Sequence, residues 1–209
     1  MNFAKALGAT ALIVLLPWSQ HGQGAEPLRF DFVNDRPFPA EAERQREFGE
    51  SLTFTNSDIV VTVTGENEFG SAVEVSRRGP GGLGVRGNGD RNAAGEGTTS
   101  GNRVNNGEHL ILSFTDGYGA PLEVVLESIV FDRVVRDTEH FADAGPTRYR
   151  LLANGESLQS GELQAEAGAV TVNFDGAKAS AEFRITNDEP FHPIANRFRV
   201  AAMTVSVAE

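Results

Sequence analysis

The chain has 209 residues, no cysteine, and 18 basic against 29 acidic side chains, which gives a formal net charge of −11. Without cysteine there can be no disulfides, thiol nucleophiles or zinc–cysteine sites. The negative charge disfavours binding to nucleic acid and to anionic lipid, because both are themselves negatively charged, and it suits cations, basic partners or neutral polysaccharide.

Residues 1–24 have the three parts of a secretory signal peptide. A positively charged start is followed by an uncharged apolar stretch around residues 12–16, and Gly22 and Gly24 supply the small residues before a cleavage site. The apolar stretch is shorter than the roughly 20 residues of a membrane-spanning helix. We therefore expect residues 25–209 to be exported to the periplasm or the exterior, with no membrane span after signal cleavage.

Most of the remaining chain alternates apolar and polar residues, which is the pattern of half-buried β-strands. Turn signals such as Asn154-Gly155 separate the strands, because both residues tolerate a positive φ. About nine short strands with no convincing helix predict an all-β protein, a single antiparallel β-sandwich or jelly-roll domain. The segments are, in chain order, 28–32, 59–64, 72–76, 110–114, 121–132, 147–153, 170–174, 181–186 and 198–207.

The phase of the alternation predicts which side chains share the core. Within 121–132 the apolar residues change phase, and a β-bulge near Ser128 would return both halves to the core. Residues 40–48 are charged and too short for a stable helix, so we expect a connector or one exposed turn. The predicted core residues are Phe30, Phe32, Val61, Val63, Leu110, Leu112, Phe114, Val172, Phe174, Phe183, Ile185 and Phe198.

A loop rich in glycine and asparagine spans about residues 86–103 and contains almost no apolar residue. Little apolar burial would offset the entropy of ordering it, so we expect a mobile loop. Leu83 and Val85 are expected to be buried and to anchor its start. Val104 and Glu108 are expected to bring the chain back into the fold.

Three short segments have a combination of residues known from one family. They are G-L-G-V at 82–85, the apolar strand with its V-N-N-G-E lead at 104–114, and F-R-V-A-A-M-T-V at 198–205. Together they resemble the extracellular β-sandwich of PEP-CTERM proteins, which Gram-negative bacteria that make exopolysaccharide export. Asn105 stands where that family usually has aspartate. The family's C-terminal Pro-Glu-Pro motif, membrane span and basic residues are missing, so the resemblance implies an ectodomain that is released.

No pattern of residues predicts catalysis. The chain has no G-x-S-x-G, H-E-x-x-H or P-loop motif, and His109, His140 and His192 lie on separate segments. A polysaccharide hydrolase is the less favoured reading, because it would need two carboxylates ~5–9.5 Å apart. Its candidates, which are better explained as a solvated loop after the 121–132 strand, are Asp132, Asp137, Glu139, His140 and Asp143. We therefore predict a protein that is not an enzyme.

Calcium is the cofactor that the loop could hold. Asn88, Asp90 and Asn92 alternate in the glycine-rich loop, and Ca²⁺ needs six to eight oxygen ligands. With one carboxylate among the three, the site needs Glu108 or Glu96 to fold over it, and we take Asn88, Asp90 and Glu108 as the candidate ligands. The sixth and twelfth positions hold Ala and Thr, which excludes an EF-hand. A plain turn-rich loop is the alternative.

Carbohydrate binding usually depends on exposed aromatic rings. Tyr118 lies between two glycines and is expected to be exposed, whereas Tyr149 alternates with Leu151 and is expected to pack inward. The signal peptide, the β-sandwich pattern and the family resemblance together predict a secreted, non-enzymatic module that is structural or interacts with exopolysaccharide or cell-surface components. The alternative is a calcium-assisted, lectin-like module with Tyr118 in its carbohydrate site.

Overall fold

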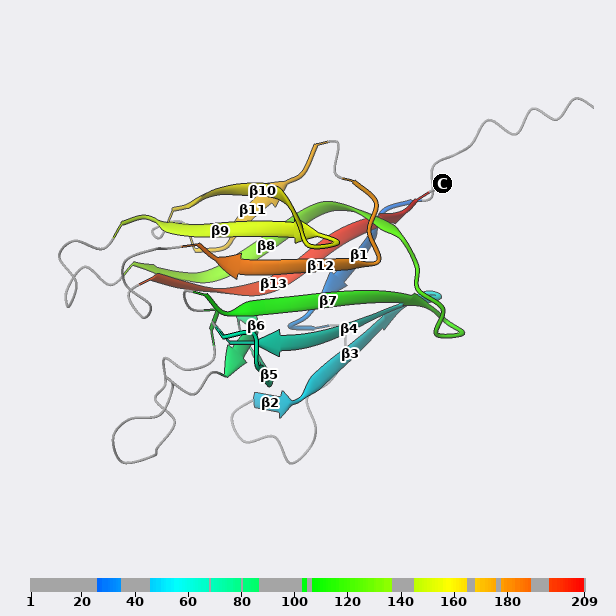
Figure 1. The fold of residues 1–209 in the computed structure, drawn as a ribbon, viewed down its shortest axis with the longest axis horizontal. Coiled ribbons are helices and arrows are strands. Elements are labelled where there is room, and N and C mark those ends of the chain that lie inside the picture. The colour runs from blue at the N-terminus through cyan, green and yellow to red at the C-terminus, as the bar shows by residue number, and fades with distance from the viewer. Residues whose placement is uncertain are drawn as a thin grey trace, which may run out of the picture.

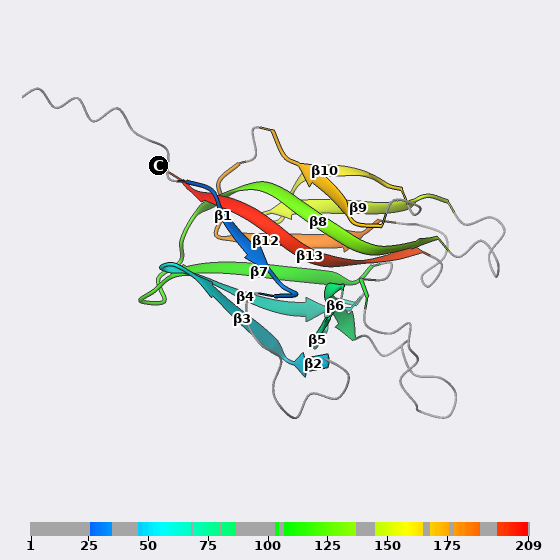
Figure 2. The same ribbon diagram turned by 180° about the vertical axis from the view of Figure 1, so that it is seen from behind.

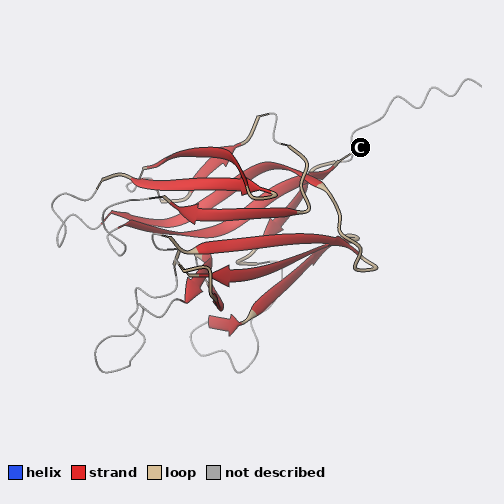
Figure 3. Cartoon of the chain, viewed as in Figure 1, coloured by secondary structure: helices blue, strands red, loops and turns tan. Residues whose placement is uncertain are grey.

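The computed structural model describes residues 26–34, 46–67, 69–79, 81–86, 103–104, 107–136, 145–164, 168–175, 178–188 and 196–208. Within these ranges every regular element is a β-strand (Figure 3), and no helix is long and apolar enough to cross a membrane. The strands are joined by hydrogen bonds into one continuous antiparallel path that folds into two layers lying face to face (Figure 1), and we call each layer a sheet. The predicted all-β sandwich is confirmed.

The first sheet is the nearer layer in Figure 1. Its strands are β3 (Ser51–Asn56), β4 (Ile59–Glu66), β7 (His109–Asp116), β9 (Thr147–Ala153), β10 (Glu156–Leu163) and β12 (Glu182–Asn187). They lie in the order β10-β9-β12-β7-β4-β3, and each neighbouring pair is antiparallel. Asn154 and Gly155, with φ of 49° and 81°, form the predicted tight turn between β9 and β10.

The second sheet lies in front when the molecule is seen from behind (Figure 2). Its strands are β1 (Leu28–Asp31), β2 (Arg46–Gly49), β5 (Ala72–Arg78), β6 (Gly82–Arg86), β8 (Val124–Arg136), β11 (Val170–Asn173) and β13 (Asn196–Val207). The order is β2-β5-β6-β13-β8-β11, and β1 also pairs with β13. The start of β5 pairs with β4 and its remainder with β6, so this strand passes from one sheet to the other.

The described residues contain thirteen strands, four more than the nine that we predicted. The additional ones are β2, β3, β6 and β10. β2 corrects the expectation of a connector over 40–48, since Arg46–Gly49 pairs with β5, while residues 40–45 lie outside the described ranges. β10 is mostly exposed along its length, so it has no clear alternation. Both strands form because a neighbouring strand supplies backbone partners, which the sequence pattern does not reveal.

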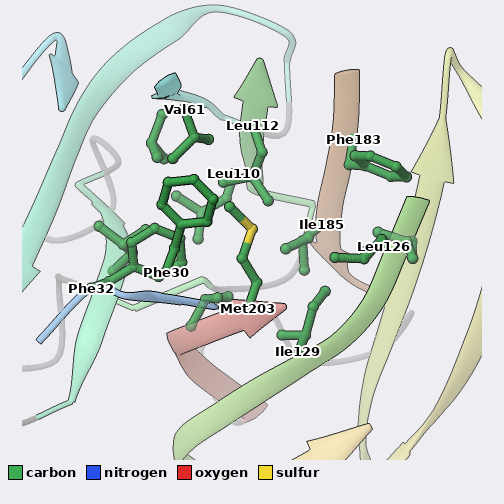
Figure 4. Packing of buried hydrophobic residues seen from close by; sticks show 14 of the residues in the cluster. Phe30, Phe32, Val61, Leu110, Leu112, Leu126, Ile129, Phe183, Ile185 and Met203 are labelled. Atoms are coloured by element: carbon green, nitrogen blue, oxygen red, sulfur yellow. The ribbon is translucent and has the colours of Figure 1, made fainter. Parts of the chain in front are cut away.

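The core between the sheets contains the side chains that the alternation predicted. Eleven of the twelve predicted core residues are buried, and the exception, Val172, is only partly buried because β11 is an edge strand. Figure 4 shows Val61 and Leu112 of the first sheet on one side of the core, with Phe30, Met203 and Ile129 of the second sheet on the other. The rings of Phe30 and Phe114 meet edge to face across the core, with centroids 6.3 Å apart.

The predicted bulge in β8 is also confirmed. Leu126 pairs with Val205 and Ser128 with Thr204, so Glu127 is an extra residue without a partner in the register. The extra residue restores the phase, and the apolar side chains on both sides of it are buried.

The glycine-rich segment begins and ends as predicted. Leu83, Val85 and Val104 are fully buried, and Glu108 is nearly so. The chain therefore leaves and re-enters the fold at these positions. The loop itself, residues 87–102, lies outside the described ranges.

Candidate functional site

Tyr118 lies at the tip of the turn that follows β7, and its side chain is 100% exposed. The prediction that it is exposed is confirmed. Tyr149 is the opposite case, because it is 3% exposed and packs inward as predicted. The Tyr118 ring is therefore fully exposed to solvent, whereas Tyr149, the other tyrosine that the structure describes, is buried.

The backbone around Tyr118 is held by four hydrogen bonds within residues 116–120, which we call the Tyr118 turn. The Asp116 carboxylate Oδ1 accepts the N–H groups of Tyr118 (2.9 Å) and Ala120 (2.8 Å). The Asp116 N–H donates to the Ala120 carbonyl (2.9 Å), and the Gly119 N–H donates to the Asp116 carbonyl (3.0 Å). Gly119 has a φ of +87°, which other residues adopt only with strain. Asp first and Gly fourth are the residues that such a turn requires.

Polar groups lie beside the Tyr118 turn. Asp116 pairs with Ile59 at the start of β4, so the turn is next to the β3–β4 turn. A Cβ on Gly117 would be 3.7 Å from the Asp58 carbonyl oxygen. Ser57 and Asp58 are both exposed. The arrangement offers a flat apolar face with hydrogen-bonding groups on the neighbouring turn.

The structure does not test the calcium prediction. Asn88 and Asp90 lie outside the described residues, and Glu108 is buried just before β7. Among the residues that the structure does describe, no group of three His, Asp or Glu side chains could hold a metal ion.

Of the five residues considered for hydrolysis, Asp132 lies in the part of the chain that the structure describes. Asp132 lies on β8, where its register partner on β13 is Arg199. The other members of that cluster fall within 137–144, outside the described residues, and so does His192. No pair of carboxylates from this cluster can therefore be placed.

His109, at the start of β7, is the histidine that the structure describes, and it lies in a charged environment. Its Nδ1 atom is buried and has no hydrogen-bond partner among the described residues. Glu66 is its register partner on β4 and forms an ion pair with Arg184 (2.9 Å). Burial lowers the pKa of His109, Glu66 raises it, and Arg184 and Arg150 lower it further, so the net shift is downward.

Acidification should therefore destabilise the wild-type protein more than a His109→Gln variant. In the unfolded chain the His109 side chain has a pKa of ~6.5 and takes up a proton more readily than in the folded protein, where its pKa is lower. His109 therefore contributes to stability in full above that pH, and this contribution is lost as the pH falls through the pKa of the folded state. Urea unfolding from about pH 7.5 to about pH 5 measures this, with the wild-type free energy of unfolding falling more steeply. Parallel pH profiles for the two proteins would contradict it.

A half-open pocket of about 220 Å³ lies beside β9 and β10, and no sequence motif pointed to it. It is lined by Arg148, Tyr149, Ser160, Gly161, Glu162 and Asp188. Its charged groups are engaged in ion pairs, because Arg148 contacts Glu162 (2.9 Å) and Arg150 contacts Asp188 (2.7 Å). The two carboxylates are thus each held by an arginine. The sequence did not indicate the pocket because its residues come from three separate segments.

Arginine side chains gather on the second sheet. Burial, and then the charges of Arg197, Arg133 and Arg78, lower the pKa of Arg103 to about 10, while Asp132 acts in the opposite direction. With a pKa of about 10, Arg103 remains charged at neutral pH. These arginines are up to 119 positions apart in the sequence, and only the pairing of β5, β6, β8 and β13 brings them together.

No protein-family model and no curated protein matches the sequence. Among solved structures, the CBM51-2 and INT domains of ZmpB from Clostridium perfringens align with 79% of this chain at 10% identity and a TM-score of 0.32. The M60 catalytic domain of ZmpB with CBM51-1 and CBM51-2 aligns with 77% at 12% identity and a TM-score of 0.30. The CBM51-2 structure in complex with GlcNAc, with INT domains, aligns with 79% at 17% identity and a TM-score of 0.25. The chain spans 41%, 20% and 41% of these structures.

Proposed function

We propose that this chain is an exported, non-enzymatic module that binds neutral polysaccharide through Tyr118. The observation that carries the proposal is the complete exposure of the Tyr118 side chain on a turn held by four hydrogen bonds. A tyrosine ring packed into a core would stabilise the fold by burying a large area, and the exposed Tyr118 ring does not. The turn thus presents a ring to solvent.

The chemistry of the ring suits a sugar. The face of an aromatic ring carries partial negative charge, so it attracts the polarised C–H groups on the apolar face of a pyranose. The phenol hydroxyl can donate and accept hydrogen bonds, and Ser57 and Asp58 expose further polar groups beside the turn. Because the backbone of the Tyr118 turn is already ordered, binding loses little conformational entropy there.

Charge and the features of residues 1–24 support the choice of partner. A net charge of −11 repels acidic polymers and leaves neutral ones unaffected. The signal-peptide pattern supports export, which would bring the protein into contact with extracellular polysaccharide. The resemblance to PEP-CTERM ectodomains is consistent with the same partner.

Tyr118→Ala should weaken binding to a neutral polysaccharide about tenfold or more, which is ~1.4 kcal/mol of binding free energy. Affinity electrophoresis in gels containing hydroxyethylcellulose, galactomannan or alginate measures this. We expect at least one neutral polymer to retard the wild-type protein and alginate not to. Tyr118→Phe keeps the ring and should keep most of the affinity.

Phe48→Ala is the matched control. Phe48 is 39% exposed, but the Arg86 guanidinium lies over its ring, 5.0 Å from the centroid, so this ring face is not available to a sugar. The proposal is wrong if Tyr118→Ala migrates like the wild type in every gel. Repeating the gels with calcium and with chelator tests the lectin-like alternative. Retardation that requires calcium would favour a site that includes Asn88, Asp90 and Glu108.

A further inference from the structure

The hairpin turn between β4 and β5 also presents an aromatic ring. We call residues 67 and 69–71 the Phe69 turn. The Asn67 side-chain Oδ1 accepts the N–H groups of Phe69 (3.0 Å) and Ser71 (2.9 Å). The Asn67 N–H donates to the Ser71 carbonyl (2.9 Å), and the Gly70 N–H donates to the Asn67 carbonyl (2.9 Å). Gly70 has a φ of +73°.

This turn repeats the Tyr118 turn bond for bond. Each of its four hydrogen bonds has a counterpart in residues 116–120, and the paired distances agree within 0.1 Å. Asn67 takes the place of Asp116, and a glycine with positive φ takes the fourth position in both. The third position holds Phe69, 81% exposed, in one turn and Tyr118, 100% exposed, in the other.

The shared position of the two rings suggests a common role, because few aromatic rings are exposed among the described residues. A single exposed apolar side chain needs no functional explanation. Among the described residues, however, the exposed large apolar side chains are Phe48, Phe69 and Tyr118, and Phe48 is only 39% exposed. The two rings that lie almost entirely in solvent occupy the same position of the same turn. In each turn, hydrogen bonds fix the backbone that carries the ring, and the ring itself is exposed rather than packed.

The two turns lie at opposite ends of one strand. β4 begins at Ile59, which pairs with Asp116, and ends at Glu66, directly before Asn67. Eight residues of extended chain separate the two turns by roughly 25 Å. A short oligosaccharide cannot reach across that distance, so each ring would contact its own segment of sugar.

We propose that Phe69 anchors a second polysaccharide contact, so that one molecule bridges two polysaccharide chains. This inference rests on the function proposed for Tyr118. Phe69 has no hydroxyl, so its contact is made by the ring face alone and is the weaker of the two. Two contacts on one rigid body can hold two polymer chains at once, which neither contact can do alone.

Titration of the ¹⁵N-labelled protein with cellotetraose and with mannotetraose tests the second contact. We expect one of these to shift the amide resonances of both turns in NMR spectra. In a Phe69→Ala variant, the ligand-induced shifts of Gly70 and Ser71 should disappear while those of Gly119 and Ala120 remain. Tyr118→Ala should give the reverse pattern.

The possible outcomes separate the two proposals. Shifts confined to the Tyr118 turn overturn the second contact and leave the proposed function standing. Shifts at neither turn, with either tetrasaccharide, overturn both. Shifts confined to the Phe69 turn overturn the role of Tyr118 and with it the bridging. Shifts at both turns that survive in Phe69→Ala would show that this ring is not the anchor.

Bridging itself is tested with polymer. Light scattering from dilute hydroxyethylcellulose or galactomannan, whichever retards the protein in gels, should report larger particles when the wild-type protein is added. Tyr118→Ala and Phe69→Ala should each abolish the increase, because each retains a single contact, and Phe48→Ala should preserve it. An unchanged particle size with wild-type protein, or an increase that survives in Phe69→Ala, overturns the bridging.

Discussion

Replacing Phe114 with alanine is expected to lower the free energy of unfolding by ~3–5 kcal/mol. Phe114 is 1% exposed and lies between the rings of Phe30 and Phe183, with centroids 6.3 Å and 6.0 Å away and interplanar angles of 72° and 87°. Phe30 belongs to the second sheet and Phe183 to the first, so this ring packs within its own sheet and across the sandwich. Its removal loses buried area, two edge-to-face contacts and the packing around the resulting cavity.

Urea unfolding followed by circular dichroism measures this loss, and two variants serve as controls. Phe114→Leu keeps an apolar side chain at the site and should cost less than about 2 kcal/mol. Phe69→Ala removes an exposed ring of the same residue type and should stay within ~0.5 kcal/mol of the wild type. A loss below ~1 kcal/mol for Phe114→Ala would mean that the two sheets do not pack as described.

Gly82→Ala is expected to cost about 3 kcal/mol or more, although it adds only a methyl group. A Cβ on Gly82 would lie 2.2 Å from the Val200 carbonyl oxygen and 2.6 Å from the Ala201 Cα. Both are backbone atoms of β13, so β6 would have to move away from its neighbour. The φ of +84° at Gly82 adds backbone strain for any other residue.

Gly155→Ala isolates the steric part of this effect. Gly155 has nearly the same φ, +81°, but nothing lies within 4 Å of the position of its Cβ. This variant should therefore lose only the backbone term, ~1 kcal/mol. Thermal and urea unfolding of the two variants give the difference. Equal losses would show that β6 and β13 do not approach each other as closely as the structure has them.

The role of Gly82 gives a physical reason for the G-L-G-V sequence at residues 82–85. The first glycine of G-L-G-V lets β6 approach the backbone of β13, and Leu83 and Val85 of the same segment are fully buried. The segment thus packs β6 into the second sheet. This explains the residues without assigning them a part in ligand binding.

The sequence allowed half of the candidate site to be predicted. Tyr118 was singled out because two glycines flank it, and its exposure follows from that local turn. Phe69 has the same signal in a weaker form, since N-E-F-G matches D-G-Y-G at the first, third and fourth positions. Its equivalence became evident only from the four matching hydrogen bonds.

Other features depended on long-range contacts and left no local signal. Arg77 is the clearest case, because a charged residue in a strand is ordinarily expected at the surface. It is fully buried, and its guanidinium donates to the carbonyls of Phe32 (2.6 Å) and Val33 (2.9 Å) and to the Glu47 carboxylate (3.3 Å). Acceptors some 30 to 45 residues away in the sequence satisfy it. The arginines around Arg103 come together in the same way.

The sequence by itself determined the fold class, the face of most strands that enters the core, the bulge in β8 and the exposure of Tyr118. These properties follow from the two-residue period of a strand and from the φ preferences of individual residues, both of which are local. The tertiary structure alone decided which strands are neighbours, how β5 joins the two sheets, and where β2 and β10 add edges. It also decided that two aromatic turns lie at opposite ends of β4, because strand order depends on contacts between distant segments whose energies no short stretch of sequence contains.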